Sequence, residues 1–321
     1  MRILVTGATG VIGQRVIPML VAEGHSVAGV GRTATKREQL ERLGARGFEL
    51  DLFDPKAVNR AVAGAEVICN LATAVPRGAR VLRPSSWREM SRIRRQASAN
   101  LVHAALESGT VRHLIQESFA PIYADAGDQW VDETFPVSPS RYNRSVLDAE
   151  ANAGRFAERG GRGVVLRFGW FYGPDDPMTD ALLQGVRRGW FPFFGSPEGY
   201  ASWLAHDDAA TAVAAALKLP SGIYNVVEDE PLRRRELAEG LAGLLKVRPP
   251  RFLPSWLTTL SGPVGQTLAR SLRISNRKFK EVAEWTPRHA TALSGLAAIL
   301  DTGSDSIHPA IASGRATRAR R

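Results

Sequence analysis

The stretch VSPSRYNRSVLDAE, residues 137–150, carries a tyrosine, Tyr142, in a segment of helical composition. A phenol can exchange a proton during a reaction, but its ordinary pKa of about 10 makes it a poor base near neutral pH. A nearby positive charge that stabilises the phenolate removes this difficulty. Arg144 and Arg94 are candidates for that charge, and Arg144, two residues away, would face the other side of a helix. Arg94 is the better candidate; the alternative is that it is an exposed arginine.

Three evenly spaced glycines in TGATGVIG lie between a short apolar run and a segment with helical apolar spacing. Glycine permits a tight turn and lets a pyrophosphate approach the N-terminus of a helix, where free N–H groups and the helix dipole favour an anion. Because the strand and the helix stand on either side, an ordinary turn is disfavoured and a dinucleotide site is predicted. The expected contacts in this loop are Gly7, Thr9, Gly10, Val11, Ile12 and Gly13.

The end of the second expected strand, where Arg32 stands, indicates which dinucleotide binds. Proteins that prefer NAD usually carry an acid there for the ribose 2′-hydroxyl, whereas Arg32, with Lys36 or Arg37, would pair with a 2′-phosphate. We expect NADP to be preferred over NAD; the alternative is that Arg32 stacks on adenine or is simply exposed. Asp51 is placed to accept a hydrogen bond from the adenine amino group, and Asp54 to cap the following helix.

A regular alternation of strands and helices must position these residues. Such an alternation predicts a parallel sheet covered on both faces, a doubly wound α/β fold. The expected strands after the first are at 25–32, 48–54, 66–72, 111–125 and 163–174, and the main helices are at 35–44, 55–65, 87–108 and 139–159. Looser spacing beyond Pro174 predicts a small C-terminal α/β lobe. We expect a nucleotide-binding domain at 1–174 with later returns from the C-terminal half, a substrate lobe at 175–302, and a basic, disordered tail at 303–321.

Taken together, the motifs resemble the extended short-chain dehydrogenase/reductase family, the NAD-dependent epimerase/dehydratase group, over most of the chain to about residue 300. The resemblance implies a Rossmann fold and chemistry that acts largely on nucleotide sugars. The motifs that carry it are TGATGVIG, LDLFD, NLAT, SFAPIY, the Tyr142 helix, LRFGWFYGP, HDDAA, YNVVEDEP and EWTP. The further cofactor contacts that it implies are Leu52, Leu71, Ala72, Thr73, Tyr142 and Phe168.

The resemblance also implies a catalytic set, and this chain departs from it. In the family a tyrosine is the acid or base, and a lysine four residues later lowers its pKa and holds the nicotinamide ribose. Tyr142 matches the tyrosine, but Val146 stands at the lysine position. A serine or threonine orients the substrate oxygen in the family; here Phe119 is at that position and Ser118 is one residue early. We expect Tyr142, Ser118 and Arg94 as the catalytic residues of an atypical member.

In family members the C-terminal lobe holds the substrate. Arg187 and Arg188 are expected to bind a diphosphate, as the forked arginine side chain does. His206 is expected to support a loop of the substrate site, and Asp208 to cap the helix after it. No His, Cys or Asp cluster has the spacing of metal ligands, so no metal is expected.

Composition narrows the class of protein further. The net charge of +10 is partly due to the arginine-rich tail, and without a recognised binding module nucleic acid is an improbable partner. The single cysteine, Cys69, excludes an internal disulfide and is expected to be buried in a strand. No apolar run is long enough for a membrane span and no signal segment is recognisable, which favours a cytoplasmic protein.

Two functions fit these observations. The first is an NAD(P)-dependent oxidoreductase, epimerase or dehydratase that transfers hydride, with a nucleotide-sugar-like or other carbonyl or hydroxyl substrate and Tyr142 as acid or base. The second is a cofactor-binding sensor without activity, which Val146 and Phe119 favour. The resemblance leaves a homodimer open as well. A basic group near the Tyr142 hydroxyl would support the enzyme, and an apolar wall around it the sensor.

Overall fold

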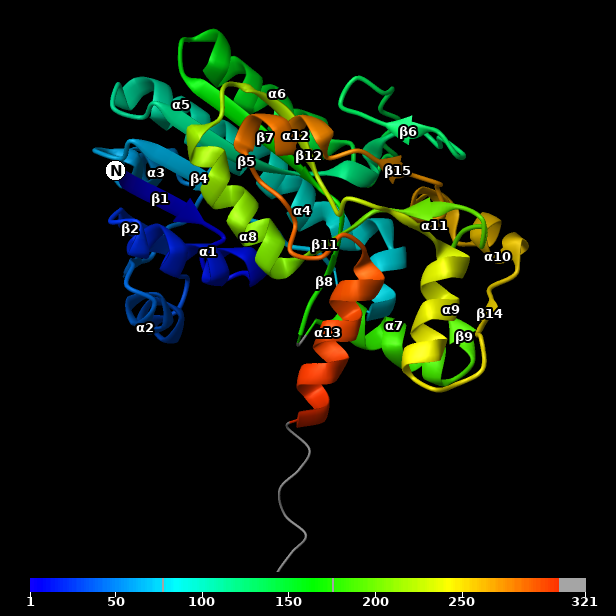
Figure 1. The fold of residues 1–321 in the computed structure, drawn as a ribbon. Coiled ribbons are helices and arrows are strands. Elements are labelled where there is room, and N and C mark those ends of the chain that lie inside the picture. The colour runs from blue at the N-terminus through cyan, green and yellow to red at the C-terminus, as the bar shows by residue number, and fades with distance from the viewer. Residues whose placement is uncertain (77, 175, 306–321) are drawn as a thin grey trace, which may run out of the picture.

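A computed structural model describes residues 1–76, 78–174 and 176–305 of the chain. Its centre is a seven-stranded sheet in the order β12-β7-β5-β4-β1-β2-β3, in which every neighbouring pair is parallel (Figure 1). The strands are β1 (Arg2–Thr6), β2 (Ser26–Val30), β3 (Arg46–Phe48), β4 (Val67–Asn70), β5 (His113–Phe119), β7 (Arg162–Phe168) and β12 (Gly222–Val226). The expected doubly wound parallel fold is confirmed.

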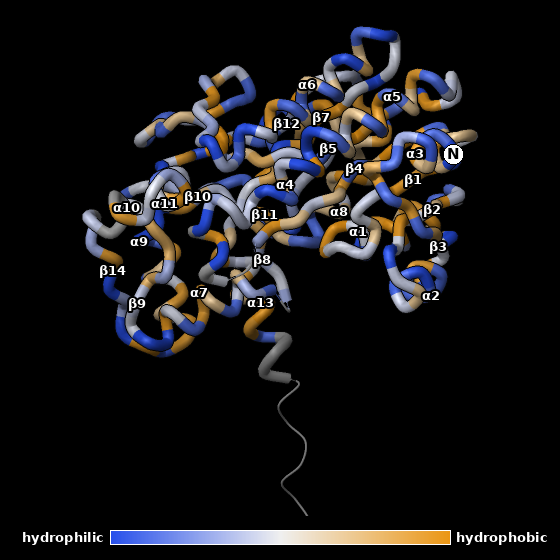
Figure 2. The backbone as a smooth tube through the Cα atoms, turned by 180° about the vertical axis from the view of Figure 1, so that it is seen from behind, coloured by the Kyte–Doolittle hydropathy of each residue, from blue (hydrophilic) through white to orange (hydrophobic). Residues whose placement is uncertain are grey.

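Helices cover both faces of this sheet, and each face has its own hydrophobic core. On one face α1, α8 and α12 pack through residues such as Leu20, Val213 and Phe279; on the other α3, α5 and α6 pack through Val58 and Phe156. β1 and β4 are hydrophobic along most of their length (Figure 2), and Cys69 is fully buried as expected. The helices are α1 (Val11–Ala22), α2 (Ala34–Arg42), α3 (Pro55–Val62), α5 (Ser98–Ser108), α6 (Ser145–Glu158), α8 (His206–Ala215) and α12 (Arg277–Ala283).

The order of the strands reverses between β1 and β4. β2 and β3 lie beyond β1, whereas β5, β7 and β12 lie beyond β4. The carboxyl ends of strands at such a reversal leave a crevice in which ligands bind. Since Thr6 is paired with Asn70, the loop after β1 and the segment 71–73 after β4 leave the sheet next to each other. The fold therefore brings two of the predicted cofactor segments together.

The third strand was expected at 48–54, and that placement is wrong, because β3 spans Arg46–Phe48 and shares only Phe48 with it. β3 ends at Phe48, and the chain turns after it because the Asp51 carboxylate accepts a hydrogen bond from the Phe53 N–H at 2.9 Å. Asp54 caps α3 as predicted: its carboxylate accepts from the Lys56 N–H at 2.9 Å.

The tyrosine helix was expected from residue 139, and that boundary is wrong. α6 begins at Ser145, and Tyr142 lies in the turn before it. Tight turns precede the helix because the Asn143 N–H bonds to the Ser140 carbonyl and the Val146 N–H to the Asn143 carbonyl, each three residues back.

The long helix expected at 87–108 is present, with an irregular middle. It consists of α4 (Arg88–Arg92), a π-helical turn (Ile93–Ala97) and α5. Such π turns occur frequently at functional sites because the extra residue redirects side chains. Arg94 lies in this turn.

The C-terminal half adds a lobe with its own hydrophobic core, to which Leu182, Trp203 and Leu241 belong. β12, α8 and α12 return from this half to the main sheet, and the boundary at residue 174, which was predicted together with such returns, stays a prediction. Short strands pair as β8 (Trp170–Tyr172) with β11 (Trp203–Ala205), β9 (Trp190–Phe191) with β14 (Arg251–Phe252), β10 (Tyr200–Ala201) with β13 (Leu232–Arg233), and β6 (Trp130–Val131) with β15 (Arg273–Ile274). The remaining helices are α7 (Pro177–Arg187), α9 (Arg234–Leu244), α10 (Ser255–Leu260), α11 (Gly262–Leu268) and α13 (Ala292–Asp305), with short 3-10 turns at Gly78–Leu82, Pro84–Trp87, Ala120–Ile122 and Ala216–Lys218.

The predicted tail at 303–321 begins inside α13, and residues 306–321 lie outside the described part of the chain. Among the described residues, none of the helices has the length and apolar character that a membrane crossing requires.

Candidate active site

The glycine loop forms a cradle that side chains would fill. Gly7 has a φ of +66°, and a Cβ on it would lie 2.3 Å from the Leu71 carbonyl oxygen. A Cβ on Gly13 would lie 2.4 Å from the Gly7 carbonyl oxygen. α1 begins directly after Gly10, which caps it without a side chain, so the first N–H groups of the helix remain available to an anion. The geometry fits the pyrophosphate of a dinucleotide.

The adenosine end of this cradle is polar and open. Arg32 is exposed, and no ion pair or hydrogen bond holds its side chain within the described chain, whereas Arg37 is paired with Glu49 at 3.1 Å. One oxygen of Asp51 accepts the Phe53 N–H and leaves the other available. Arg32 is therefore the freer of the two arginines for a 2′-phosphate, and the choice between NADP and NAD remains a prediction.

The remaining predicted cofactor contacts follow β3, β4 and β7. Leu52 is half-buried, and its carbonyl accepts a hydrogen bond from the Asn100 amide at 2.9 Å. After β4 the chain emerges from the core: Leu71 is buried and Thr73 is exposed, with Ala72 between them. Phe168 is buried at the end of β7, where its ring centre lies 5.6 Å from that of Phe171.

Tyr142 is buried in a mainly apolar cluster. Only 6% of it is exposed, and its ring meets the Trp87 ring edge to face with the centres 4.8 Å apart. Met90 and Val264 complete the cluster. Two segments distant from Tyr142 in sequence therefore enclose this phenol: the continuous stretch 84–92, which contains α4, and α11 of the C-terminal lobe.

The Tyr142 hydroxyl has no hydrogen-bond partner among the described residues. Burial raises the pKa of Tyr142 to about 12, although Thr267, Arg270 and Arg94 act in the opposite direction. The Thr267 hydroxyl donates to the Pro263 carbonyl at 2.8 Å and also forms a hydrogen bond of 2.6 Å with the Ser140 hydroxyl. At neutral pH Tyr142 is thus a neutral phenol, able to donate a proton and poorly suited to accept one.

Arg94 lies in the predicted region, buried with only 4% exposure, while Arg144 is exposed. Arg94 Nη2 donates to Glu117 Oε1 at 3.0 Å, which forms a buried ion pair. Its Nε and the other Glu117 oxygen have no partner in the part of the chain described, and neither does the Asn143 amide. Unpaired buried polar atoms are costly, and those of Arg94, Glu117, Tyr142 and Asn143 belong to segments that meet at the site. A bound cofactor and substrate would satisfy such atoms.

Ser118 is committed to a buried network. Its hydroxyl donates to Glu150 Oε1 at 2.5 Å, and Glu150 accepts two further hydrogen bonds from Arg167 at 2.8 and 2.7 Å. Arg167 also donates to the Tyr123 hydroxyl at 2.8 Å, which in turn donates to Asn225 at 2.7 Å. Because the Ser118 proton is used by Glu150, Ser118 could meet a substrate only as an acceptor.

Apolar side chains occupy the two positions where the family carries polar ones. Val146 is fully buried in the first turn of α6. Phe119 is half-buried at the end of β5, and its ring meets Trp170 edge to face at 5.2 Å. Aromatic and aliphatic groups therefore line much of the described site, beside the Arg94–Glu117 ion pair and the Ser118–Glu150–Arg167 network.

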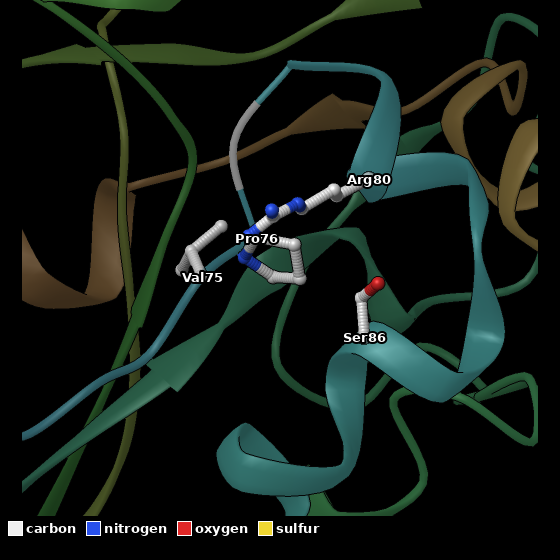
Figure 3. Close-up of a pocket in the computed structure, with 4 residues that line it drawn as sticks. All are labelled: Val75, Pro76, Arg80 and Ser86. Carbon is white, nitrogen blue, oxygen red and sulfur yellow. The ribbon is translucent and has the colours of Figure 1, made fainter.

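An open cavity of about 570 Å³ adjoins this cluster, lined by Val75, Pro76, Arg80 and Ser86 (Figure 3). Two residues that line the cavity are sequence neighbours of residues near Tyr142. Ser86 directly precedes Trp87. Val75 directly follows Ala74, whose N–H donates to the Met90 sulfur at 3.3 Å. The exposed Arg80 gives the cavity one cationic side.

The residues predicted for substrate binding differ in their exposure to solvent. Arg187 and Arg188 are exposed at the end of α7, and no described contact joins them to Tyr142. His206 is buried, with Nε2 3.9 Å from Asp176, and burial lowers its pKa to about 4. Asp208 does not cap α8, which begins at His206; instead it accepts the Arg288 N–H at 2.9 Å. Among the described residues no three His, Cys, Asp or Glu side chains are arranged to hold a metal.

A doubly wound sheet with a glycine cradle after β1 and a tyrosine before α6 defines a dinucleotide-binding protein of the extended short-chain dehydrogenase/reductase type. The family model described as NAD dependent epimerase/dehydratase family matches residues 3–226, and the chain belongs to that family.

Three known proteins illustrate the likeness. A 3-diazoavenalumate denitrifying reductase from Streptomyces is 31% identical over 310 residues, which cover 92% of this chain and 99% of that protein. A 2-alkyl-3-oxoalkanoate reductase from Shewanella oneidensis is 24% identical over 292 residues, 84% of this chain and 72% of that protein. The crystal structure of the Thermus thermophilus UDP-glucose 4-epimerase complex with NAD has a TM-score of 0.74 and 25% identity, and covers 96% of this chain and 100% of that one.

Several residues of the site were not identified from the sequence. Trp87, Glu117, Thr267 and Arg270 reach the surroundings of Tyr142 from other elements. Only Glu117 carried a local signal, since it lies in the same strand end as Ser118.

Proposed function

We propose that this protein is an NAD(P)H-dependent reductase that carries out net hydride transfer to a carbonyl or similarly polarised group. Tyr142 is the proton donor, and the substrate has a largely apolar body. The observation that carries the proposal is the buried Tyr142 hydroxyl, which has no hydrogen-bond partner among the described residues, together with the apolar Val146 four residues later.

The direction of the reaction follows from that observation. Epimerases and dehydratases of nucleotide sugars begin by oxidising a hydroxyl, and this step needs a base to remove its proton. A phenol whose pKa burial raises to about 12 is protonated at neutral pH. A carbonyl that accepts hydride needs a proton donor instead. The protonated phenol is the form that reduction uses, and the proposal assigns Tyr142 that role.

The residues of the cradle fit a dinucleotide. Gly7 and Gly13 leave room for the pyrophosphate, and α1 offers its N–H groups. When bound, the cofactor supplies the hydride. Tyr142 donates its proton to the oxygen of the group that is reduced, and solvent then restores that proton. Arg32 favours NADPH over NADH in this proposal, because its side chain is exposed and unpaired among the described residues.

The two curated relatives described above support reduction, since both are named as reductases and the first matches this chain over nearly its whole length. The nucleotide-sugar substrate remains the alternative, suggested by the name of the Thermus thermophilus enzyme. In that case Arg187 and Arg188 would bind the diphosphate. The aromatic and aliphatic lining around Tyr142 favours an apolar carbonyl compound.

Consumption of NADPH tests the proposal. We expect absorbance at 340 nm to fall with aromatic ketones, aldehydes or 3-oxo acids, and Tyr142→Phe to lower kcat by about 10²- to 10⁴-fold at unchanged NADPH affinity. Release of 4-epimerised or dehydrated sugar nucleotide without net NADPH consumption would contradict it.

A second function, a non-catalytic NADPH sensor, is favoured by the phenylalanine at position 119 and the apolar wall around Tyr142. Tight NADPH binding without turnover across both substrate panels would establish the sensor instead. If neither NADPH nor NADH binds, both proposals are wrong.

A further inference from the structure

A proton donor such as Tyr142 is more effective when a cation stabilises the phenolate that it leaves behind. In this chain α6 and the turn before it supply no such cation, since Val146 is apolar and Arg144 is exposed. Arg94 is close, but its charge is largely compensated by Glu117 at 3.0 Å. The site still lacks an uncompensated positive charge from these elements.

Such a charge comes from the C-terminal lobe. α11 packs on Tyr142 through Val264, and Leu268 contacts the same cluster. One turn of α11 is bound to the tyrosine turn itself, because the Thr267 and Ser140 hydroxyls are 2.6 Å apart. Arg270 follows α11 by two residues and is half-buried.

Hydrogen bonds fix both the side chain and the backbone of Arg270. Its Nη1 donates to the Tyr123 carbonyl at 2.8 Å, which places the guanidinium at the carboxyl end of the central sheet, beyond β5. Its own carbonyl accepts a hydrogen bond from Arg234 Nη2 at 2.7 Å. Arg234 is buried beneath the loop of Gly195 and Gly199, where a Cβ would lie 2.7 and 2.5 Å from the guanidinium.

No carboxylate neutralises Arg270 within the described residues. Asp125 favours the charged form of Arg270 electrostatically, but its oxygens accept the N–H groups of Ser271 and Gly127 at 3.0 and 3.2 Å and form no ion pair with Arg270. The hydrogen bond recorded for this half-buried guanidinium among the described residues is the one to the Tyr123 carbonyl, and partial burial strengthens the effect of its charge on its neighbours.

We propose that Arg270 takes the place of the family's lysine and stabilises the phenolate that forms when Tyr142 donates its proton. This inference rests on the proposed reductase function. According to this inference, the active site has all its charged groups only when α11 of the C-terminal lobe is packed on the turn that contains Tyr142. The charged groups facing Tyr142 are then Arg94 with Glu117 from the long helix and β5, and Arg270 from the lobe.

The effects of Arg270 and Tyr142 on each other's pKa agree with a position of Arg270 close to Tyr142. Arg270 lowers the pKa of Tyr142 more than Arg94 does, in opposition to the larger effect of burial. Burial in turn lowers the pKa of Arg270, and Tyr142 acts against that shift.

The first test replaces the cation. Arg270→Met should lower kcat by about 10- to 100-fold, because an opposite charge within a few ångströms shifts a pKa by roughly 1 to 2. Arg270→Lys should recover most of that loss. Arg273→Met is the matched control: it removes the same charge from the same segment, but its guanidinium lies 4.2 Å from the Trp130 ring centre. We expect it to change kcat less than about threefold, and equal losses in both variants would overturn the inference.

The second test moves the charge back to the helix. Val146→Lys, added to Arg270→Met, should restore at least part of kcat, because a lysine at that position supplies the cation from the other side. A double variant that is folded, binds NADPH and is no more active than Arg270→Met would contradict the proposal. Thermal melting establishes that each variant is folded.

A third measurement does not depend on turnover. 3-Fluorotyrosine placed at position 142 ionises at lower pH than tyrosine, and its ¹⁹F shift follows that ionisation. Arg270→Met should raise its pKa by about 1 or more, and Arg273→Met should leave it unchanged. This shift can be present even if no reductase activity is found, which would leave the Arg270–Tyr142 interaction standing and the reductase function wrong. An unchanged pKa in an active enzyme would reject Arg270 and leave the function intact.

Discussion

The two ends of the crevice are built in opposite ways. At the cofactor end, Gly7 and Gly13 bring backbone against backbone, and the binding groups are the N–H groups of α1. At the tyrosine end, the binding groups are buried side chains, several of which are charged or have no partner among the residues that the structure describes. A backbone cradle accepts the same pyrophosphate whatever the reaction, whereas side chains determine which reaction follows. This difference explains how a chain retains the family's cofactor end while Val146 and Phe119 have changed the other.

The largest effect should come from breaking the buried ion pair beneath the tyrosine end. Arg167→Met leaves the Glu150 carboxylate, 7% exposed, without its bidentate partner, and we expect a loss of about 3–5 kcal/mol in the free energy of unfolding. Urea denaturation measures this loss. Arg167→Met combined with Glu150→Leu should recover much of the stability, because no uncompensated charge then remains. A loss below about 1 kcal/mol in the single variant would show that buried charge does not stabilise this end.

The next prediction concerns a buried group far from either ligand end. His113 is at the start of β5, and burial, together with Arg162, lowers its pKa to about 4. An unfolded histidine takes up a proton near pH 6.5, so between pH 6.5 and 4 the unfolded chain binds more protons than the folded one. Stability contributed by neutral His113 is present above pH 6.5 and is lost as the pH falls to about 4, by up to about 3 kcal/mol.

The measurement is the difference between the wild type and His113→Gln, because other groups titrate in the same range. His206 acts in the same direction, and the raised pKa of buried Glu228 acts in the opposite one. Urea midpoints at pH 7 and pH 4.5 should differ less in the variant, while NADPH affinity at pH 7 stays unchanged. A change in cofactor affinity would mean that buried polar groups outside the site also determine ligand binding.

A smaller effect is expected at the cofactor end. Gly7→Ala places a Cβ 2.3 Å from the Leu71 carbonyl oxygen, at a φ of +66° that side chains rarely adopt. We expect a loss of about 2–3 kcal/mol in NADPH binding, roughly 100-fold in the dissociation constant. Fluorescence titration measures it, and Gly64→Ala is the control, since it has a similar φ of +81° and nothing within 4 Å of its Cβ position. Equal losses in both would show that backbone strain, and not the cradle, is responsible.

The contrast between the two ends also shows what the sequence could predict. The glycine loop, the Asp54 cap and the order of strands and helices depend on residues near each other in the chain and were found as expected, whereas the bounds of the third strand were wrong. The surroundings of Tyr142 depend on packing between α4, β5 and α11, which local periodicity does not contain. The start of α6 was misplaced because the turn at Ser140 is bound to Thr267, more than a hundred residues later.

The smallest effect should be the choice of cofactor. Arg32→Ala removes an exposed guanidinium without disturbing packing, and we expect NADPH to bind about tenfold less tightly while NADH binding is unchanged, a difference of about 1.4 kcal/mol. Arg37→Ala is the matched control, because Glu49 already pairs with that arginine at 3.1 Å. If NADH and NADPH lose affinity equally in the Arg32 variant, its side chain stacks on adenine instead of binding a phosphate. Equal losses would also mean that a side chain, and not the backbone alone, recognises the dinucleotide at the cofactor end. The two ends would then differ only in how much their side chains contribute to binding.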